Sequence, residues 1–327
     1  MASSRREDYL YPTGVIKVLE TRLLTKDGIE RLIDARSFDD ALHVLREIGY
    51  AEEELRKDID GSLDTEAKGT YALMLGISPT REFIDLFLIN HDFYNLKLLA
   101  KYKLGLIPKS DVDRLWLDLG TMPARIDVDA SLDELGKTMP DYAHAVETVI
   151  KHYERLDDPQ VIGAGLDAEF LAALTKIQDE FLSGVVRAYI DFCNLKTIIR
   201  AKEMGKRKEF MEAALAVGGD LDKDELLDLY AKNLDVIFDW IGKSRYGDDL
   251  SDALSRYRGE GLMPFEGAVS EAITRRVKSA KYIPYGLEPL FIYLFKKVRE
   301  IRSIRAVLRG KKNELPPEDI RVILSAV

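Results

Sequence analysis

A six-residue motif that occurs three times along the chain constrains its fold more than any other feature. Residues 92–97 (DFYNLK) return 99 residues later as residues 191–196 (DFCNLK), and a blurred third copy at 300–305 (EIRSIR) follows 109 residues after the second. The third copy carries Ser303 where the first two carry an asparagine. Each copy then runs into a glycine, at Gly105, Gly205 and Gly310. Self-similarity at a nearly constant period indicates a chain built from structural repeats.

The residues around the motif copies follow a helical pattern almost throughout. Apolar side chains recur at steps of three and four residues over 15–24, 64–75 and 81–104, which is typical of helices. A polar turn at 26–28 is expected to end the first of these, and Ser37 has the position of a helix N-cap. The sequence therefore predicts an all-α protein.

Other landmarks repeat with the motif and suggest where one repeat ends. The stretch from Ser37 to Tyr50 resembles the one from Ser131 to Tyr142, and residues 235–246, which end at Tyr246, form a fainter copy. Glycine and proline residues near 121 and 219 mark boundaries, and no low-complexity linker separates the parts. We therefore expect three packed helical repeats, at residues 1–121, 122–219 and 220–327.

Composition excludes several classes of protein. The formal charge of −9 and the pI near 5.2 argue against a nucleic-acid binder, whose phosphate-facing surface is normally basic. A single cysteine, Cys193, excludes an internal disulfide. The most apolar runs, 83–90 and 290–295, are too short to span a bilayer, and no apolar run follows the first six residues as in a secretory signal. We expect a soluble intracellular protein.

No stretch of the chain has the pattern of a catalytic or cofactor site. Residues 163–165 (GAG) lack the lysine that a phosphate-binding loop requires. Cys193 has no histidine near it in sequence and lies in an apolar helical pattern, which favours a structural role over a nucleophilic one. We therefore expect no cofactor and no small-molecule substrate.

One catalytic alternative stays open, an all-helical metal phosphohydrolase of the HD type. His43 and the pair His91 and Asp92 supply residue types that ligate metals in such a site. The second copy of the motif, however, has Ile190 before Asp191, so the repeat accounts for the acid and not for the histidine. The other alternative is a generic helical-repeat adaptor for unrelated proteins.

The polar positions of the motif allow two interpretations. The acid and the asparagine of each copy lie three residues apart, which places them on one helix face amid apolar residues. They are either buried and hydrogen-bonded to the adjoining helix of the same repeat, the interpretation we favour, or exposed toward a central opening. These positions are Asp92, Asn95, Asp191, Asn194 and Glu300.

The basic positions of the motif are candidates for docking an acidic partner. Lys97 and Lys196 lie four residues before Lys101 and Arg200, and like charges at that spacing are unfavourable unless acids lie nearby. Residues 296–312 carry a charge of +7, which leaves the rest of the chain at −16. We expect a docking surface at Lys97, Lys196, Arg302, Arg305 and Arg309.

With these residues the sequence resembles the C subunit of the V-type and A-type rotary ATPases, the counterpart of the eukaryotic d subunit. The resemblance covers the whole chain and rests on Tyr9 and Tyr11 ahead of residues 22–24 (RLL), and on the doubled motif at 92–97 and 191–196. It is most specific at the block from Tyr282 through 286–290 (GLEPL) to Arg305.

The resemblance implies a non-catalytic protein with three similar helical subdomains that form a funnel around a pseudo-threefold axis. Such a protein caps the membrane proteolipid ring, receives the central shaft subunits of the D and F type, and passes torque between them. It implies a monomer in isolation, a single copy in the complex, and a peripheral place on the cytoplasmic face of the membrane. In that arrangement Lys97, Lys196 and Arg305 are expected to form a basic triad around one shared space.

Overall fold

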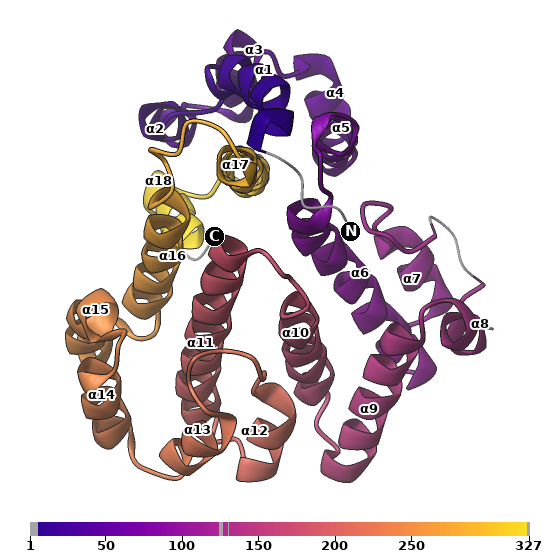
Figure 1. The fold of residues 1–327 in the computed structure, drawn as a ribbon, viewed down its shortest axis with the longest axis vertical. Helices are drawn as coiled ribbons and strands as arrows, with labels where there is room; N and C mark the ends of the chain where they lie inside the picture. Colours follow the sequence, from indigo (N-terminus) through magenta and orange to yellow (C-terminus); the bar gives the residue numbers. More distant parts are fainter. Residues whose placement is uncertain (1–5, 124–126, 130, 326–327) are drawn as a thin grey trace. The chain divides into compact units, whose positions relative to one another are not determined.

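The structure, a computed structural model, describes residues 6–123, 127–129 and 131–325, and these residues contain helices and no strand (Figure 1). The predicted all-α class is therefore confirmed. The chain divides into two compact units. Unit 1 combines residues 1–84 with 256–327, and unit 2 holds residues 85–255. The division into three repeats and the funnel remain predictions.

Unit 1 is assembled from both ends of the chain. Its longest helix, α17 (Leu287–Lys312), packs against α1, α2, α3, α5 and α18, and Figure 1 shows it end-on among the N-terminal helices. Apolar side chains such as Leu290, Leu294 and Ile304 are fully buried along α17. The other elements are η1 (Arg6–Tyr9), α1 (Leu10–Glu20), α2 (Lys26–Asp34), α3 (Phe38–Glu47), α4 (Glu52–Lys57), α5 (Ile59–Ile77), α16 (Met263–Lys278) and α18 (Pro317–Ser325).

Unit 2 is built around a core to which α6, α9, α10 and α11 contribute, with Leu96, Val146, Leu166 and Ile190 fully buried in it. Helices α6 (Glu82–Lys103) and α15 (Gly247–Glu260) begin in one unit and end in the other. The remaining helices are α7 (Lys109–Leu115), α8 (Ser131–Thr138), α9 (Pro140–Leu156), α10 (Gln160–Leu174), α11 (Glu180–Glu203), α12 (Lys208–Ala214), α13 (Lys223–Tyr230) and α14 (Leu234–Lys243).

Local chemistry explains where several helices begin and end. The predicted cap is confirmed, since Ser37 Oγ accepts a hydrogen bond from the Asp40 amide at 3.1 Å. Gly105 and Gly205 end α6 and α11 with φ of +68° and +62°, a conformation that favours glycine. Gly310 differs, because it lies within α17 where a Cβ would come within 2.7 Å of Ile320. The third glycine therefore serves the packing of α18 and not a helix end.

Two predicted boundaries were wrong. Residues 26–28 form the first turn of α2 and not a break, because Thr25 caps the helix by accepting from the Gly28 amide at 3.1 Å. The helix predicted at 64–75 extends over α5, since Asp58 caps its start and Gly76 continues it. The long helix predicted at 81–104 is confirmed as α6.

No helix in the described part of the chain is long and apolar enough to cross a membrane.

Candidate functional site

The acid of each motif copy holds a chain segment by accepting several hydrogen bonds in a buried position. Asp92, fully buried on α6, accepts from the amides of Thr121 and Met122 at 2.8 and 2.9 Å. It also accepts from the Thr121 hydroxyl at 2.6 Å and from the Tyr142 hydroxyl at 3.0 Å. We call this arrangement, an acid bound to a backbone amide and a tyrosine hydroxyl, an acid–tyrosine clamp.

The second clamp repeats the first on α11. Asp191 accepts from the amides of Asp220 and Leu221 at 2.9 and 3.1 Å and from the Tyr246 hydroxyl at 2.6 Å. Burial raises the pKa of Asp191 despite these hydrogen bonds, which act in the opposite direction. Burial and the bonded carboxylate also raise the pKa of Tyr246 far above its usual value, so the tyrosine stays a donor.

The third clamp, on α17, uses a different set of donors. Glu300 accepts from the Leu24 amide at 2.5 Å and from the Tyr50 hydroxyl at 2.7 Å. Lys297, itself buried, donates to Glu300 at 2.8 Å and pairs with Glu66 at 2.8 Å. Burial alone would lower the pKa of Lys297, but these carboxylates raise it above its usual value. Lys297 is therefore a charged donor to Glu300, whereas each of the other two acids has a second backbone amide as a donor.

The asparagines of the motif form a second repeated contact. Asn95 exchanges two hydrogen bonds with the backbone of Leu117, at 2.8 and 2.9 Å. Asn194 makes the same pair with Ala216, both at 2.9 Å. The carboxamide suits this ring, because it carries the donor and the acceptor on two separate atoms. Ser303 in the third copy carries both functions on a single hydroxyl oxygen.

These contacts correct one sequence prediction about the polar positions. All five positions are buried and hydrogen-bonded, as favoured: Asp92, Asn95, Asp191, Asn194 and Glu300. The asparagines bond within their own predicted repeat, but the tyrosine of each clamp lies in the next predicted repeat. With the predicted repeat bounds, Glu300 of the third repeat accepts hydrogen bonds from Leu24 and Tyr50 of the first repeat. The landmarks Tyr50, Tyr142 and Tyr246 were visible in the sequence, but nothing in it paired them with the acids.

The basic positions differ in their surroundings. In unit 2, Lys97 pairs with Asp167 at 2.5 Å. In unit 1, Arg305 pairs with Asp64 at 2.5 Å, and Arg309 pairs with Asp60 at 2.8 Å. Arg302 is exposed on the same helix. Lys196 is half-buried, and no carboxylate of the described part of unit 2 lies within ion-pairing distance of it.

The metal alternative finds no support in the geometry. His43 Nδ1 lies 3.0 Å from Glu52 in unit 1, whereas Asp92 belongs to unit 2 and is already occupied by its clamp donors. Within residues 6–123, 127–129 and 131–325, no group of three or more potential ligands could hold a metal ion.

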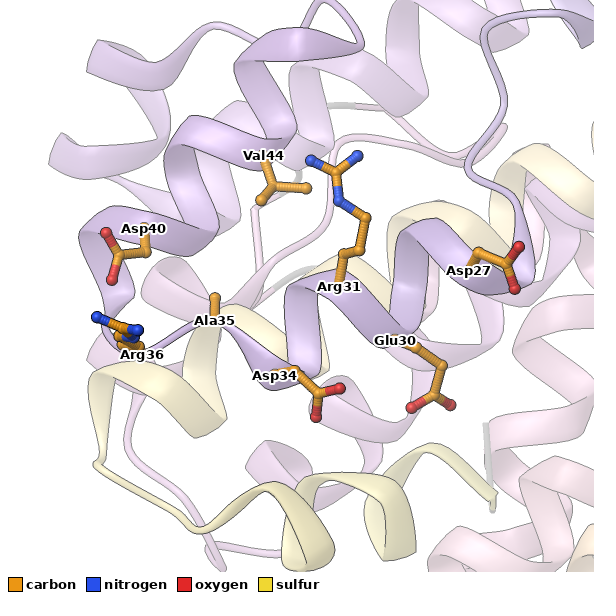
Figure 2. A pocket seen from close by; sticks show the side chains of 8 residues that line it. All are labelled: Asp27, Glu30, Arg31, Asp34, Ala35, Arg36, Asp40 and Val44. Atoms are coloured by element: carbon orange, nitrogen blue, oxygen red, sulfur yellow. The ribbon is translucent and has the colours of Figure 1, made fainter.

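A pocket between α2 and α3 is lined mostly by charged side chains, and three of them, Glu30, Arg31 and Asp34, form ion pairs (Figure 2). Arg321 of α18 pairs with Glu30 and Asp34 at 3.1 and 2.6 Å. Arg31 points away from these two acids in Figure 2 and pairs with Glu47 at 2.8 Å. The lining residues are Asp27, Glu30, Arg31, Asp34, Ala35, Arg36, Asp40 and Val44.

Comparison with known proteins identifies the family. The family model of the ATP synthase (C/AC39) subunit matches residues 12–323, nearly the whole chain. The chain belongs to this family. Members of the C/AC39 family are structural subunits of an ATPase complex and not catalytic ones, so this protein is not an enzyme.

The similarity to curated C/AC39 relatives extends over nearly their full length. The C subunit of the A-type ATP synthase of Desulfurococcus sp. (strain SY) is 26% identical, over 98% of this chain and 91% of its own. The C subunit of the V-type sodium ATPase of Enterococcus hirae is 22% identical, over 94% of this chain and 95% of its own. These matches confirm the resemblance that the motif residues indicated.

Two glycines of this C/AC39 protein allow the acids of the first two clamps to reach the backbone. A Cβ at Gly120 would lie 2.0 Å from Asp92 Oδ1, and one at Gly219 would lie 1.9 Å from Asp191 Oδ1. In the third clamp Leu23 precedes the bonded amide, and the acid is the longer Glu300.

Replacing Gly219 by alanine is expected to lower the free energy of unfolding by about 1–3 kcal/mol, because the new methyl group displaces Asp191 from its amide donors. Urea unfolding measures the loss. Gly163→Ala is the control, since this glycine of α10 has nothing within 4 Å of the place that a Cβ would take. The control should be neutral or stabilising by up to about 1 kcal/mol. Equal stability of the two variants would contradict the role of Gly219.

Proposed function

We propose that this protein is a rotor component of the central stalk, which links the central shaft to the membrane proteolipid ring. In this role it binds shaft subunits of the D and F type on one side and the ring on the other. It passes torque between ATP chemistry and ion movement. Membership of the C/AC39 family, whose relatives are named as C subunits of A-type ATP synthases and of a V-type sodium ATPase, supports this proposal.

The observation that carries the proposal is the repeated clamp. A protein that passes torque must resist deformation, and tightly packed helices have low compressibility. The clamps at Asp92 and Asp191 add fixed polar contacts between a long helix and the helical region that follows it, and the clamp at Glu300 adds such contacts between α17 and the N-terminal helical region. The clamp at Glu300 also ties the C-terminal long helix to the N-terminal residues Leu24 and Tyr50. These hydrogen bonds thereby join α17 to the N-terminal helical region.

We propose further that the three repeats, residues 1–121, 122–219 and 220–327, form a funnel with pseudo-threefold symmetry. One copy of it sits on the cytoplasmic face of the membrane as a peripheral component. The cations Lys97, Lys196 and Arg305, with Arg302 and Arg309, are the proposed docking positions for acidic groups of the shaft. Partly exposed ion pairs of this kind each contribute about 0.2–1 kcal/mol, so docking relies on several of them.

Co-purification from detergent-solubilised membranes tests this function. A tagged copy of the full chain should bring down the shaft subunits and the proteolipid. The detached catalytic head, prepared without this chain, should keep its ATP hydrolysis, because the chain supplies no catalytic group. Recovery of unrelated soluble proteins alone would favour the generic adaptor, and loss of hydrolysis in the head preparation would contradict the non-catalytic rotor role.

A further inference from the structure

The turn between α16 and α17, in unit 1, exposes two tyrosines that take no part in the clamps (Figure 1). Tyr282 is 83% exposed, the highest value for a large apolar side chain among the described residues, and Tyr285 is exposed as well. A single exposed ring is ordinary on a protein surface, but these rings lie among cations. We call residues 278–285 (KSAKYIPY) the basic–tyrosine turn.

The backbone of the basic–tyrosine turn fixes which side chains face the solvent. The Lys281 amide donates to the Lys278 carbonyl at 3.0 Å, and the Ile283 amide donates to the Ala280 carbonyl at 3.0 Å. Two tight turns therefore follow the end of α16 directly. Ala280 is buried, whereas Lys281 and Tyr282 after it are exposed. Hydrogen-bonded backbone thus presents the lysine and the tyrosine ring to the solvent together.

The charge around the basic–tyrosine turn has a single sign. Residues 272–287 contain four basic side chains and no acid, on a chain whose formal charge is −9. Arg275, Lys278 and Lys281 are exposed, and Lys281 Nζ lies 4.7 Å from the centre of the Tyr282 ring. Charges more than about 8 Å apart in solvent are largely screened at physiological salt, so distant acids of the chain do not cancel this local charge.

Two kinds of anionic surface could accept such a turn, an acidic protein and a lipid bilayer. Lysine is depleted from protein–protein interfaces, and its ammonium is a strongly hydrated charge. At a bilayer surface the ammonium keeps its water while it attracts anionic lipid, and a tyrosine ring lies at the level of the headgroups. The pairing of exposed lysines with the exposed Tyr282 therefore favours the bilayer.

We propose that the basic–tyrosine turn binds the anionic lipid headgroups of a membrane surface. Lys278 and Lys281 supply the electrostatic attraction, and the ring of Tyr282 enters the headgroup layer. This contact goes beyond the proposed rotor function, in which the proteolipid ring joins the protein to the membrane. It is a property of the chain itself and does not require the shaft or the ring.

Sedimentation of the purified full-length chain with lipid vesicles tests the proposal. The chain should bind vesicles of equal parts phosphatidylcholine and phosphatidylglycerol, and it should not bind vesicles of phosphatidylcholine alone. Lys278→Gln with Lys281→Gln should weaken the binding about 25-fold, since each lysine near an anionic bilayer strengthens it about fivefold. Tyr282→Ser should also weaken it but leave its salt dependence unchanged, because the ring carries no charge.

Lys26→Gln with Lys312→Gln is the matched control, since it removes two exposed lysines of the same unit that lie outside the turn. The net charge changes equally in the two double variants. Vesicle binding by the control should stay within about twofold of the unmodified chain, because charges away from the bound surface are screened. All these variants replace exposed side chains, so their melting temperatures should change little.

Three results would overturn the proposal. The unmodified chain might leave the anionic vesicles unbound. Equal weakening by the two double variants would show that net charge, and not the turn, attracts the chain to lipid. Weaker binding of purified shaft subunits by Lys278→Gln with Lys281→Gln, with vesicle binding unchanged, would assign the turn to an acidic protein partner. In each case the shaft and the proteolipid can still co-purify with the tagged chain, so the rotor function is tested separately.

Discussion

Replacing Glu300 by alanine is expected to lower the free energy of unfolding by about 3–5 kcal/mol, the usual cost of breaking a buried ion pair from one side. Lys297 is only 8% exposed and would lose its buried partner. The remaining acid beside it, Glu66, has a side chain that is 43% exposed and cannot compensate fully. The Leu24 amide and the Tyr50 hydroxyl would also lose their acceptor.

A double-mutant cycle with Lys297→Met separates the ion pair from the other losses. Methionine fills the space of the lysine stem without a charge, so Glu300→Ala with Lys297→Met should be more stable than Glu300→Ala alone. Arg309→Ala is the control for a surface pair, and it should cost less than about 1 kcal/mol because Arg309 and Asp60 are both about half exposed. A double variant no more stable than Glu300→Ala would show that charge burial is not the source of the loss.

Replacing Asp191 by alanine is expected to cost about 3 kcal/mol or more. The change leaves two buried backbone amides and the Tyr246 hydroxyl without an acceptor, and each unsatisfied buried group costs about 1–3 kcal/mol. Urea unfolding measures the loss. Asp167→Ala is the control, because its carboxylate is 61% exposed and its removal should cost less than about 1 kcal/mol.

The pH dependence of the Asp191→Ala effect has a definite sign. Burial raises the folded-state pKa of Asp191 above the ordinary value of 3.8. At a pH between 3.8 and the raised pKa, Asp191 is therefore protonated in the folded chain and ionised in the unfolded chain. The contribution of Asp191 to stability therefore decreases as the pH rises from 3.8 through the raised pKa. The stability difference between the unmodified chain and Asp191→Ala should be larger near pH 4 than near pH 7. A difference that grows with pH would contradict a raised pKa.

Much of the candidate site was predictable because its members recur in the sequence. Asp92 and Asp191 stood out through their identical flanks, and the clamp tyrosines appeared as landmarks of the same period. The glycines at 120 and 219 were read as boundary markers, although they also admit the carboxylates of the clamps. Sequence reasoning missed Lys297, since neither of the other motif copies has a cation three residues before its acid.

The sequence by itself determined the helices, the family and the polar positions of the motif. These depend on periodicity, caps and repetition, all of which are local properties of the chain, as Ser37 at the start of α3 illustrates. The prediction of a turn at 26–28 failed for a local reason as well. The hydrogen bond by which Thr25 caps α2 outweighed the polar composition of these residues.

Only the tertiary structure decided which groups bind one another. The ion pair of Lys97 with Asp167 joins residues 70 positions apart, and that of Arg305 with Asp64 joins residues 241 apart. Nothing in a motif states which acid will reach a cation, because that depends on how helices pack and on which side chains their packing brings within a few ångströms. For the same reason, three cations that look alike in the sequence have different electrostatic surroundings in the folded chain.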